Sequence, residues 1–327
     1  MARRLIVLST GGTIAMAAAA PEAGGDLRFN AHALIEAAPG LDALARIEAR
    51  DVLAKPSASF TLADQAKIAR AAEEAAREAD GVVVTHGTDT LEETAFALSL
   101  LTRVDAPIVL TGAMRRPDQP GADGPANLLA AARVALCEQA RALGPLVVMD
   151  DEIFCAHLVR KSHSFRPHAF SAHPFGPIGH VAEGRVRVVL KPAALPPQIS
   201  FGAGSARVAI LEAGAGFCAE TALALATVVD GLVLSLPGAG HVAADAAPAL
   251  GELAQRLPVV FATRTGAGET LASSYAYAGG EIDLIARGLI PAGPLDARKA
   301  RVALQLLLSD GADRARVGAY FAMFSAT

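Results

Sequence analysis

The stretch "DGVVVTHGTDTLEETAFALSLL" (Asp80–Leu101) decides the fold, because it passes from an apolar run through a polar loop into an alanine- and leucine-rich segment. Its three valines are β-branched and end in turn-forming residues, which predicts a buried strand over Gly81–Thr85. The segment after the loop predicts a helix over Leu91–Leu101. A strand joined to a helix by a short loop is part of a βαβ unit, so the stretch favours a parallel sheet covered by helices.

The same alternation of short apolar runs and alanine-rich stretches continues along the chain, as in repeated βαβ units. The predicted strands are Leu5–Leu8, Gly81–Thr85, Pro107–Thr111, Leu146–Met149, Val208–Leu211, Gly231–Ser235 and Val259–Ala262. The predicted helices are Leu62–Glu78, Leu91–Leu101, Pro125–Ala142, Ala219–Val229, Ala243–Arg256 and Ala297–Ser309.

We therefore expect a two-domain α/β protein. The larger N-terminal domain, residues 1–190, should contain a mostly parallel, doubly wound sheet, and the smaller α/β C-terminal domain should span residues 208–327. Residues 191–207 are rich in proline and glycine and follow neither a helical nor a strand period, which predicts the interdomain linker.

Composition limits the possible functions. With 327 residues, of which 52% are hydrophobic and 19% charged, the chain can bury a large core. A net charge of -4 with scattered arginines offers no basic field, so we expect no nucleic-acid partner. The apolar runs are too short for a membrane span or a signal peptide, so we expect a cytoplasmic protein. Cys137, Cys155 and Cys218 are odd in number and widely spaced, which favours reduced thiols.

Polar residues gather where the predicted parallel strands end. Ligands of such sheets bind beyond the carboxyl ends of the strands. Three loops reach that edge: "STGGTIAM" (Ser9–Met16), "HGTDT" (His86–Thr90) and "TGAMRRPDQPGADGPAN" (Thr111–Asn127). The sequence therefore predicts a ligand site at this edge.

The first loop places a threonine after two glycines. Gly11 and Gly12 let the backbone turn sharply and approach a ligand, which leaves Thr13 at the end of the strand. Taken alone, the motif is more typical of a turn in which Thr10 or Thr13 bonds to its own backbone. The G-x-G-x-x-G spacing and a P-loop lysine are both absent from it, which argues against a dinucleotide or nucleotide site.

The second loop also has a structural explanation, because Asp89 or Thr90 followed by two glutamates predicts a helix cap. Capping does not explain why Thr88 and Asp89 occur together beside His86. A threonine hydroxyl needs a neighbouring base or cation to become a nucleophile. Asp89 can accept a proton or bind an ammonium group, and Lys161, after a predicted strand over residues 145–154, is the candidate cation.

Five histidines lie close together between His157 and His180. Prolines interrupt the segment, and it lacks the i, i+4 pair of a helical zinc site. This pattern favours a polar hairpin region over a metal site.

These motifs carry a family resemblance. "LSTGGTIAM" and "VVVTHGTDTLEETAF" resemble the two signature stretches of the bacterial L-asparaginase/glutaminase family, and the similarity continues through "VLTGAMRRPDQPGADGPANL" and "RKARVALQLLL". It covers essentially the whole chain, and two separate motifs are far more specific than one. The resemblance implies two α/β domains, a homotetramer built from close dimers, and no metal or cofactor. It also implies an active site between the N-terminal domain of one subunit and the C-terminal domain of its neighbour.

Site roles follow from the resemblance at the matching positions. Thr13 matches the nucleophile, while Thr88, Asp89 and Lys161 match the second hydroxyl, the carboxylate and the ammonium group. The substrate-binding positions are Gly12, Ser57, Ala58, Gly87, Ala113, His241 and Glu281. Among these, the resemblance gives the substrate carboxylate to Ser57 and the leaving amide nitrogen to the Ala113 carbonyl. Glu281 matches a glutamate that holds the substrate amine from the neighbouring subunit.

The sequence departs from the family pattern at three points. The mobile loop, expected over Ala17–Asp26, normally supplies a tyrosine, but residues 17–32 contain none. Its proton-transfer role would then fall to Thr88 and Lys161, or to a tyrosine from elsewhere. Ala58 stands where many members have a glutamine, and His241 where an asparagine is common.

The resemblance implies hydrolysis of L-asparagine to L-aspartate and ammonia through a threonine acyl-enzyme. L-Glutamine is an alternative or additional substrate, because one methylene provides only about 1–3 kcal/mol of discrimination. Two further functions fit the same motifs: the ammonia-producing subunit of a tRNA-dependent amidotransferase and a catalytically silent amino-acid sensor. The amidotransferase form usually carries an extra N-terminal domain, and the sensor would bind aspartate without releasing ammonia from any amide.

Overall fold

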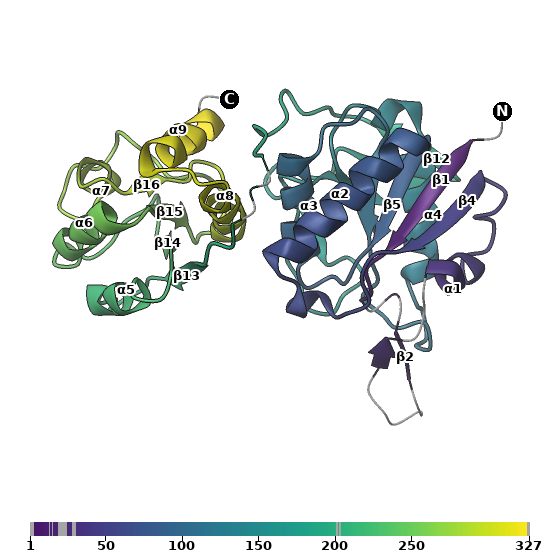
Figure 1. Ribbon diagram of the computed structural model, residues 1–327, viewed down its shortest axis with the longest axis horizontal. Helices are drawn as coiled ribbons and strands as arrows, with labels where there is room; N and C mark the ends of the chain where they lie inside the picture. The colour runs from purple at the N-terminus through teal and green to yellow at the C-terminus, as the bar shows by residue number, and fades with distance from the viewer. Residues whose placement is uncertain are drawn as a thin grey trace. The chain divides into compact units, whose positions relative to one another are not determined.

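The computed structural model describes residues 3–12, 14, 16–18, 25–27, 31–200, 202 and 204–325. The chain divides into two compact units, Met1–Leu195 and Pro196–Thr327, each with its own sheet (Figure 1). The predicted two-domain α/β class is confirmed.

The first unit is built on a large mixed sheet. Within the described residues the sheet has eight strands in the order β12-β11-β8-β7-β6-β5-β1-β4. They are β1 (Arg4–Ser9), β4 (Arg46–Asp51), β5 (Gly81–Thr85), β6 (Ile108–Thr111), β7 (Leu146–Met149), β8 (Glu152–Cys155), β11 (Gly179–Ala182) and β12 (Arg185–Val188). Strands β4, β1, β5, β6 and β7 are parallel, whereas β8, β11 and β12 extend the sheet with antiparallel pairings.

Alternation along the strands divides the core of this unit between the two sheet faces. Leu5 and Val7 of β1 pack with α4 and α1, whereas Ile6 and Leu8 pack with α2 and α3. The helices are α1 (Ala31–Glu36), α2 (Leu62–Glu78), α3 (Leu91–Leu101) and α4 (Gly124–Ala135). Figure 1 shows α2 and α3 passing in front of the strands. The helices on both faces leave the carboxyl ends of the parallel strands as the edge at which loops gather.

One predicted strand is wrong in its extent. The run over residues 145–154 is not a single strand, because it folds back on itself as the antiparallel pair β7–β8. The turn is made by Asp150 and Asp151, whose φ values of 52° and 62° are left-handed. Two consecutive left-handed residues match the twist of a tight hairpin, and aspartate tolerates this conformation better than most residues.

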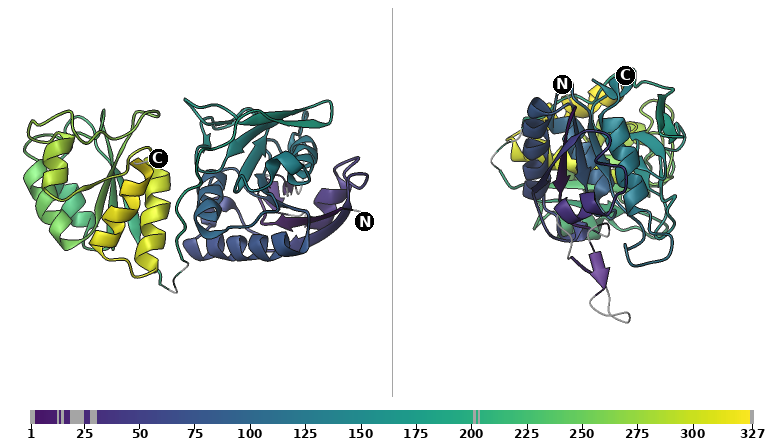
Figure 2. Two further views of the ribbon diagram at one scale, coloured as in Figure 1. Left: turned by 90° about the horizontal axis from the view of Figure 1, so that it is seen from above. Right: turned by 90° about the vertical axis from the view of Figure 1, so that its right-hand side faces the viewer.

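The second unit has a smaller, fully parallel sheet in the order β13-β14-β15-β16. Its strands are β13 (Val208–Glu212), β14 (Gly231–Leu236), β15 (Val259–Thr263) and β16 (Ile290–Pro291). Its helices are α5 (Ala219–Leu225), α6 (Ala247–Arg256), α7 (Glu281–Ala286), α8 (Ala297–Ser309) and α9 (Arg314–Ser325). In the left view of Figure 2, α5 to α7 and the pair α8–α9 lie on opposite sides of this sheet.

A buried ion pair holds the start of α8. Lys299 is only 3% exposed, and its Nζ lies 3.0 Å from Oδ2 of Asp296. The same carboxylate caps α8 by accepting the backbone N–H groups of Arg298 and Lys299. Burial alone would raise the pKa of Asp296, but the charge of Lys299 and these hydrogen bonds hold the pKa below its ordinary value.

Replacing this cation should destabilise the second unit. We expect Lys299→Met to lower the free energy of unfolding by about 3 kcal/mol, because it leaves the Asp296 carboxylate without its ammonium partner. Urea unfolding monitored by circular dichroism measures the effect, with exposed Lys191→Met as the control. Equal stability of both variants would contradict a structural role for the pair.

Candidate functional site

The loops that follow β1, β5 and β6 contact one another at the carboxyl edge of the first sheet. A Cβ atom added to Gly12 would lie 2.3 Å from Cα of Gly87, so only glycine allows the first two loops to approach so closely. A Cβ atom added to Gly112 would lie 2.6 Å from the His86 carbonyl oxygen, which brings the third loop to the same place. The structure thus brings the three predicted polar loops together.

Lys161 lies between β8 and β11 in the chain and contacts the loop that follows β5. Its Nζ donates hydrogen bonds to Oγ1 of Thr88 and to Oδ1 of Asp89, both at 2.9 Å. Thr88 is buried and the Lys161 side chain is 15% exposed, whereas Asp89 is 66% exposed. A cation beside a buried hydroxyl favours loss of the hydroxyl proton. The exposed carboxylate balances that charge and remains accessible to a ligand.

Ser57 faces the same loops from a short 3-10 turn, η2 (Ser57–Ser59). It is 2% exposed, and its Oγ has no hydrogen-bond partner. A Cβ atom on Gly87 would lie 2.6 Å from this hydroxyl, so glycine keeps the space open. A buried polar atom without a partner costs free energy unless a ligand satisfies it. Ala58, next in the turn, is exposed.

The expected side-chain cap of α3 is wrong for Thr90. This residue is the N-cap, but its hydroxyl does not accept a hydrogen bond from the helix. It donates instead to the Ser57 backbone carbonyl at 2.9 Å. Thr90 therefore ties the turn that carries Ser57 to the loop that carries Thr88 and Asp89.

A second anchor fixes the segment around Ser57. Asp64, in the first turn of α2, accepts hydrogen bonds from Nζ of Lys55 at 2.6 Å and from the hydroxyl of Thr61 at 2.6 Å. Burial alone would raise the pKa of Asp64, but these two donors hold the pKa below its ordinary value. Thr61 and Asp64 also form a capping box, so the residues on both sides of the turn are held by one carboxylate.

His86 is a buried structural group in this loop. Its Nδ1 lies 2.6 Å from the Gly87 carbonyl oxygen and its Nε2 lies 2.9 Å from Oγ1 of Thr94. Because a carbonyl only accepts, Nδ1 carries the hydrogen and Nε2 accepts from the threonine. Burial lowers the pKa of His86 to about 4, so the ring is neutral at physiological pH. The positive charge at this edge comes from Lys161 rather than from His86.

The lowered pKa of His86 predicts a pH dependence of stability. Below pH 6.5 the unfolded chain binds a proton that the folded chain excludes down to about pH 4, so stability decreases as the pH falls through this window. At about 1.4 kcal/mol per pKa unit, the loss amounts to about 3 kcal/mol. Urea unfolding between pH 7 and 4 should show this component in wild type and in exposed His180→Gln, but not in His86→Gln. An unchanged pH dependence in His86→Gln would contradict the assignment.

Ala113 lies in the loop after β6 and is fully buried. Asn127 of α4 holds the loop, because its Nδ2 donates to the Gly112 carbonyl oxygen at 3.0 Å. Asp123 accepts the backbone N–H of Met114 at 2.9 Å. The motifs did not single out Asp123 or Asn127 as site residues, although both lie within the third polar loop. Both residues support that loop, and none of their observed hydrogen bonds is to Thr88 or Lys161.

His241 and Glu281 lie together in the second unit. Nε2 of His241 is 3.3 Å from Oε2 of Glu281, and neither atom makes a hydrogen bond. The other oxygen, Oε1, accepts the backbone N–H groups of Ser274 and Tyr275 at 2.7 Å each. Although burial alone would raise the pKa of Glu281, these N–H groups hold the pKa below its ordinary value.

The rings of Tyr275 and Tyr277 pack against His241 rather than against Glu281 itself. Their rings meet the His241 ring edge-on, at centroid distances of 4.9 Å and 5.6 Å. Both tyrosines are partly exposed, whereas the Glu281 side chain is fully buried. No motif of the sequence places these two tyrosines beside Glu281. The cluster combines a buried carboxylate oxygen that lacks a donor with aromatic rings, which suits a ligand ammonium group.

Two predicted features fall outside the described residues. Thr13, the expected nucleophile, is one of them, and so are residues 19–24 of the expected mobile loop. The flanking strands β2 (Met16–Ala18) and β3 (Gly25–Leu27) pair antiparallel.

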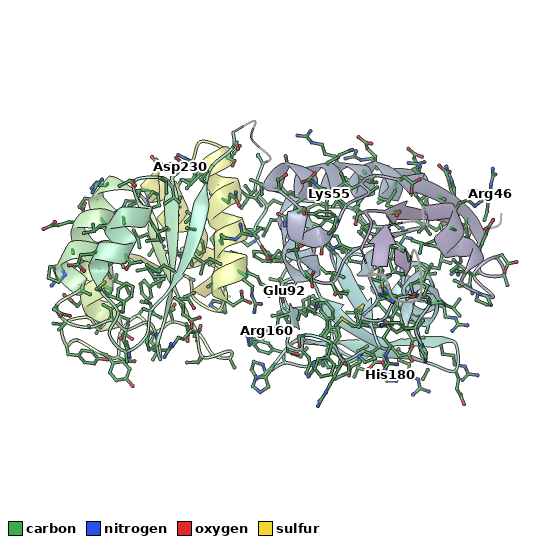
Figure 3. All side chains as sticks on the ribbon, turned by 90° about the horizontal axis from the view of Figure 1, so that it is seen from below. Arg46, Lys55, Glu92, Arg160, His180 and Asp230 are labelled. Carbon is green, nitrogen blue, oxygen red and sulfur yellow. The ribbon has the colours of Figure 1, made fainter. Side chains whose placement is uncertain are left out.

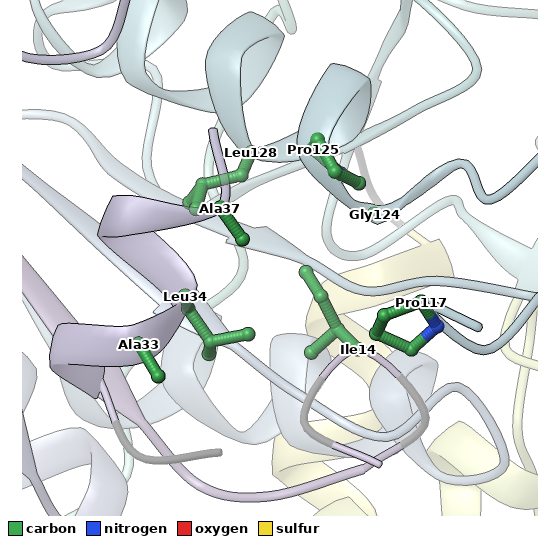
Figure 4. Close-up of a pocket in the computed structure, with 8 residues that line it drawn as sticks. All are labelled: Ile14, Ala33, Leu34, Ala37, Pro117, Gly124, Pro125 and Leu128. Carbon is green, nitrogen blue, oxygen red and sulfur yellow. The ribbon is translucent and has the colours of Figure 1, made fainter. Parts of the chain in front are cut away.

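A cavity beside Ile14 is lined by residues without polar side chains (Figure 4). It lies between α1, the start of α4 and the loop before it. Its lining residues are Ile14, Ala33, Leu34, Ala37, Pro117, Gly124, Pro125 and Leu128. A cavity without a polar side chain does not suit a charged small molecule. The polar edge around Thr88 is therefore the better candidate for the active site.

Comparison with known proteins shows the family of the chain. Residues 4–194 match the family described as "Asparaginase, N-terminal", and residues 207–321 match "Glutaminase/Asparaginase C-terminal domain". A probable L-asparaginase of Deinococcus radiodurans is 41% identical, covering 95% of this chain and 94% of its own. A probable periplasmic L-asparaginase of Haemophilus influenzae is 31% identical, covering 98% and 93%. A glutaminase-asparaginase of Acinetobacter glutaminasificans is 38% identical over 55% of this chain and 56% of its own.

A solved structure agrees as well. The crystal structure of a probable cytoplasmic L-asparaginase from Campylobacter jejuni superimposes with a TM-score of 0.86 at 32% identity, covering 98% of this chain and 99% of that chain. The fold and these similarities define a two-domain amidohydrolase. The chain belongs to the asparaginase/glutaminase family. No helix among the described residues is both long and apolar enough to span a membrane.

Proposed function

We propose that the chain is an L-asparaginase that works through a threonine acyl-enzyme. The observation that carries this proposal is the pair of 2.9 Å contacts from Nζ of Lys161 to Thr88 and Asp89, beside the glycine loop that leads into Thr13. A hydroxyl, a carboxylate and an ammonium group at one strand edge provide the proton transfers that amide hydrolysis needs. The named activities of the relatives support the same reaction.

The proposed reaction has two displacements. The Thr13 hydroxyl oxygen bonds to the side-chain amide carbon of asparagine, and its proton passes by way of the Thr88–Lys161 pair to the amide nitrogen. The carbon–nitrogen bond then breaks and ammonia leaves. Water attacks the acyl group, the bond to Thr13 breaks, and the threonine regains a proton as aspartate is released. Backbone N–H groups beside Thr13 and Thr88 would stabilise the oxyanion, each by about 3 kcal/mol.

Substrate recognition follows from the unsatisfied polar groups. The buried Ser57 hydroxyl, which lacks a partner, can donate to the α-carboxylate of the substrate. Asp89 is exposed enough to accept a hydrogen bond from the α-ammonium group. As part of the proposal, Glu281 and His241 approach the same ammonium group from a neighbouring subunit, because Glu281 Oε2 lacks a donor of its own.

A site built for a zwitterion should reject simpler amides. Succinamic acid lacks the α-amino group of asparagine and β-alaninamide lacks its α-carboxylate, so each should show a kcat/KM at least about 10³-fold lower. L-Glutamine should be a weaker substrate, within about 10–200-fold of asparagine, because it differs by one methylene. Ammonia release measures all four. Aspartate binding without ammonia release from any amide would contradict the enzyme and favour the silent sensor.

Ser57→Ala gives the matched control for these substrates. It should lower kcat/KM for asparagine but have little effect on kcat/KM for β-alaninamide, which has no α-carboxylate for Ser57 to bind. An equal loss for both substrates would show that Ser57 does not bind the α-carboxylate.

The proposal includes a dual specificity as its second candidate, because several relatives are named glutaminase-asparaginase. It also includes a homotetramer in the cytoplasm. The Campylobacter jejuni protein supports the compartment, whereas the Haemophilus influenzae relative is described as periplasmic. Light scattering measures the oligomer, and fractionation of the producing cell locates the protein.

A further inference from the structure

Lys161 stands on a very short element. It is the second residue of β9 (Arg160–Lys161), whose antiparallel partner β10 (Phe170–Ser171) is equally short. Two-stranded ribbons are marginally stable by themselves, even when they are longer than this. The ribbon alone therefore does not explain why Nζ of Lys161 is held at 2.9 Å from two partners.

A buried glutamate supplies the missing restraint. Glu92, in the first turn of α3, is 2% exposed, and its Oε2 accepts the backbone N–H of Lys161 at 2.5 Å. In Figure 3, Glu92 and Arg160, the residue before Lys161, are labelled close together. The bond fixes the main chain of Lys161 rather than its side chain.

The loop that leads into α3 carries the residues that Lys161 contacts. Thr88 and Asp89 come directly before α3, and Glu92 is its second residue. The helix start thus holds Lys161 at three points: the main chain through Glu92, and Nζ through Thr88 and Asp89. Because all three points lie within five consecutive residues, the Glu92 bond opposes any movement of β9 that would carry the amine away from the hydroxyl.

We propose that Glu92 is a positioning residue of the active site, which acts by fixing the backbone of Lys161 so that its amine meets Thr88. This inference rests on the proposed function of the Thr88–Lys161 pair. It gives Glu92 of "LEET" a role beyond helix capping, because the Glu92 carboxylate bonds to a strand 69 residues further along the chain.

Three substitutions of Glu92 distinguish the effect of side-chain length from the effect of charge. Glu92→Gln keeps the length of the side chain and an acceptor oxygen, Glu92→Asp keeps the charge but withdraws the acceptor, and Glu92→Ala removes both. Misplacement of a catalytic group by about 1 Å can cost about 100-fold in rate. We expect kcat to fall roughly 10–100-fold in Glu92→Ala and Glu92→Asp, with Glu92→Gln near wild type and KM little changed in all three. Exposed Glu74→Gln is the control and should keep full activity.

Two readouts separate positioning from general stability. Hydrogen exchange measured by mass spectrometry should be faster at the Lys161 amide in Glu92→Ala and Glu92→Asp than in Glu92→Gln. In a Lys161→Met background, where kcat is already reduced, Glu92→Asp should cause no further loss, because residues that act as a unit are not additive.

The outcomes are distinguishable. A higher kcat in Glu92→Asp than in Glu92→Gln, or an additive loss in the Lys161→Met background, overturns the positioning role and leaves the proposed function intact. Full activity of Lys161→Met alone overturns the proposed proton transfer and the role of Glu92 with it. Should Glu92→Ala fail to fold, the comparison of Glu92→Asp with Glu92→Gln decides the question.

Discussion

Thr88→Val should lower kcat for amide hydrolysis by about 10³-fold while the protein remains folded. Valine has nearly the same shape as threonine, so the buried space stays filled, but the oxygen that accepts from Nζ of Lys161 at 2.9 Å is lost. The amine then has no hydroxyl through which to move a proton to or from the reacting amide. The measurement is steady-state ammonia release from L-asparagine, together with the thermal unfolding midpoint.

A matched control removes a hydroxyl elsewhere. Thr227→Val changes an exposed threonine of the second unit, whose hydroxyl bonds only to the Ala224 carbonyl in the observed contacts, and it should keep wild-type kcat. Thr13→Ala should be at least as inactive as Thr88→Val, because it removes the proposed nucleophile. If Thr88→Val and Thr13→Ala both release ammonia at the wild-type rate, neither hydroxyl takes part in the chemistry.

The buried elements of the fold could be predicted from the sequence because their patterns are local. Every predicted strand overlaps an observed one, and the helices Leu62–Glu78, Leu91–Leu101 and Ala297–Ser309 have the predicted bounds. The capping box at Thr61 and the cap at Asp296 explain two of these starts, since each polar side chain precedes an apolar periodic run.

Two helix ends were predicted wrongly, because the alanine-rich sequence favours a helix where the backbone does not form one. The helix predicted to begin at residue 243 begins at Ala247, because Pro248 is tolerated only in the first turn of a helix. The helix predicted to reach Ala142 ends at Ala135 and is followed by the 3-10 turn Glu138–Ala140. Alanine and other residues that favour a helix occupy most of these positions, so propensity could not indicate the break.

Edge strands were missed for a different reason. β4 (Arg46–Asp51) has the sequence "RIEARD", and its residues are exposed or half-buried. Charged edge strands protect a sheet from pairing with other chains, but they hide the alternation by which a strand is recognised. The register of β4 with β1 depends on tertiary contact that no short window of sequence contains.

The candidate site was predictable in its residue types but not in its supports. The motifs indicated Thr88, Asp89 and Lys161, and the structure places these three in direct contact. Glu92 was assigned to a helix cap because its partner, the Lys161 backbone, is far away in the sequence. Contacts between a side chain and a distant backbone N–H leave no pattern in either segment, so only the structure could reveal this one.

Gly12→Ala should lower kcat by at least about 100-fold, because it moves the residue that precedes the proposed nucleophile. Gly12 has φ of +90°, and its added Cβ would lie 2.3 Å from Cα and 2.4 Å from N of Gly87. Both are backbone atoms, so no side chain can rotate away, and the loops after β1 and β5 must separate. A displacement of about 1 Å at this point can cost about 100-fold in kcat.

Gly40→Ala separates the clash from the backbone strain. Gly40 has a similar φ of +82°, but a Cβ atom there would meet nothing within 4 Å. Gly40→Ala should therefore lower the free energy of unfolding by only about 1–2 kcal/mol, the cost of a left-handed alanine, and should keep wild-type kcat. Gly12→Ala should lose both stability and kcat, because the contact with Gly87 adds to the same strain. Wild-type kcat in Gly12→Ala would mean that the two loops can part without disturbing the reaction, and the close approach of Gly12 to Gly87 would then be irrelevant to catalysis.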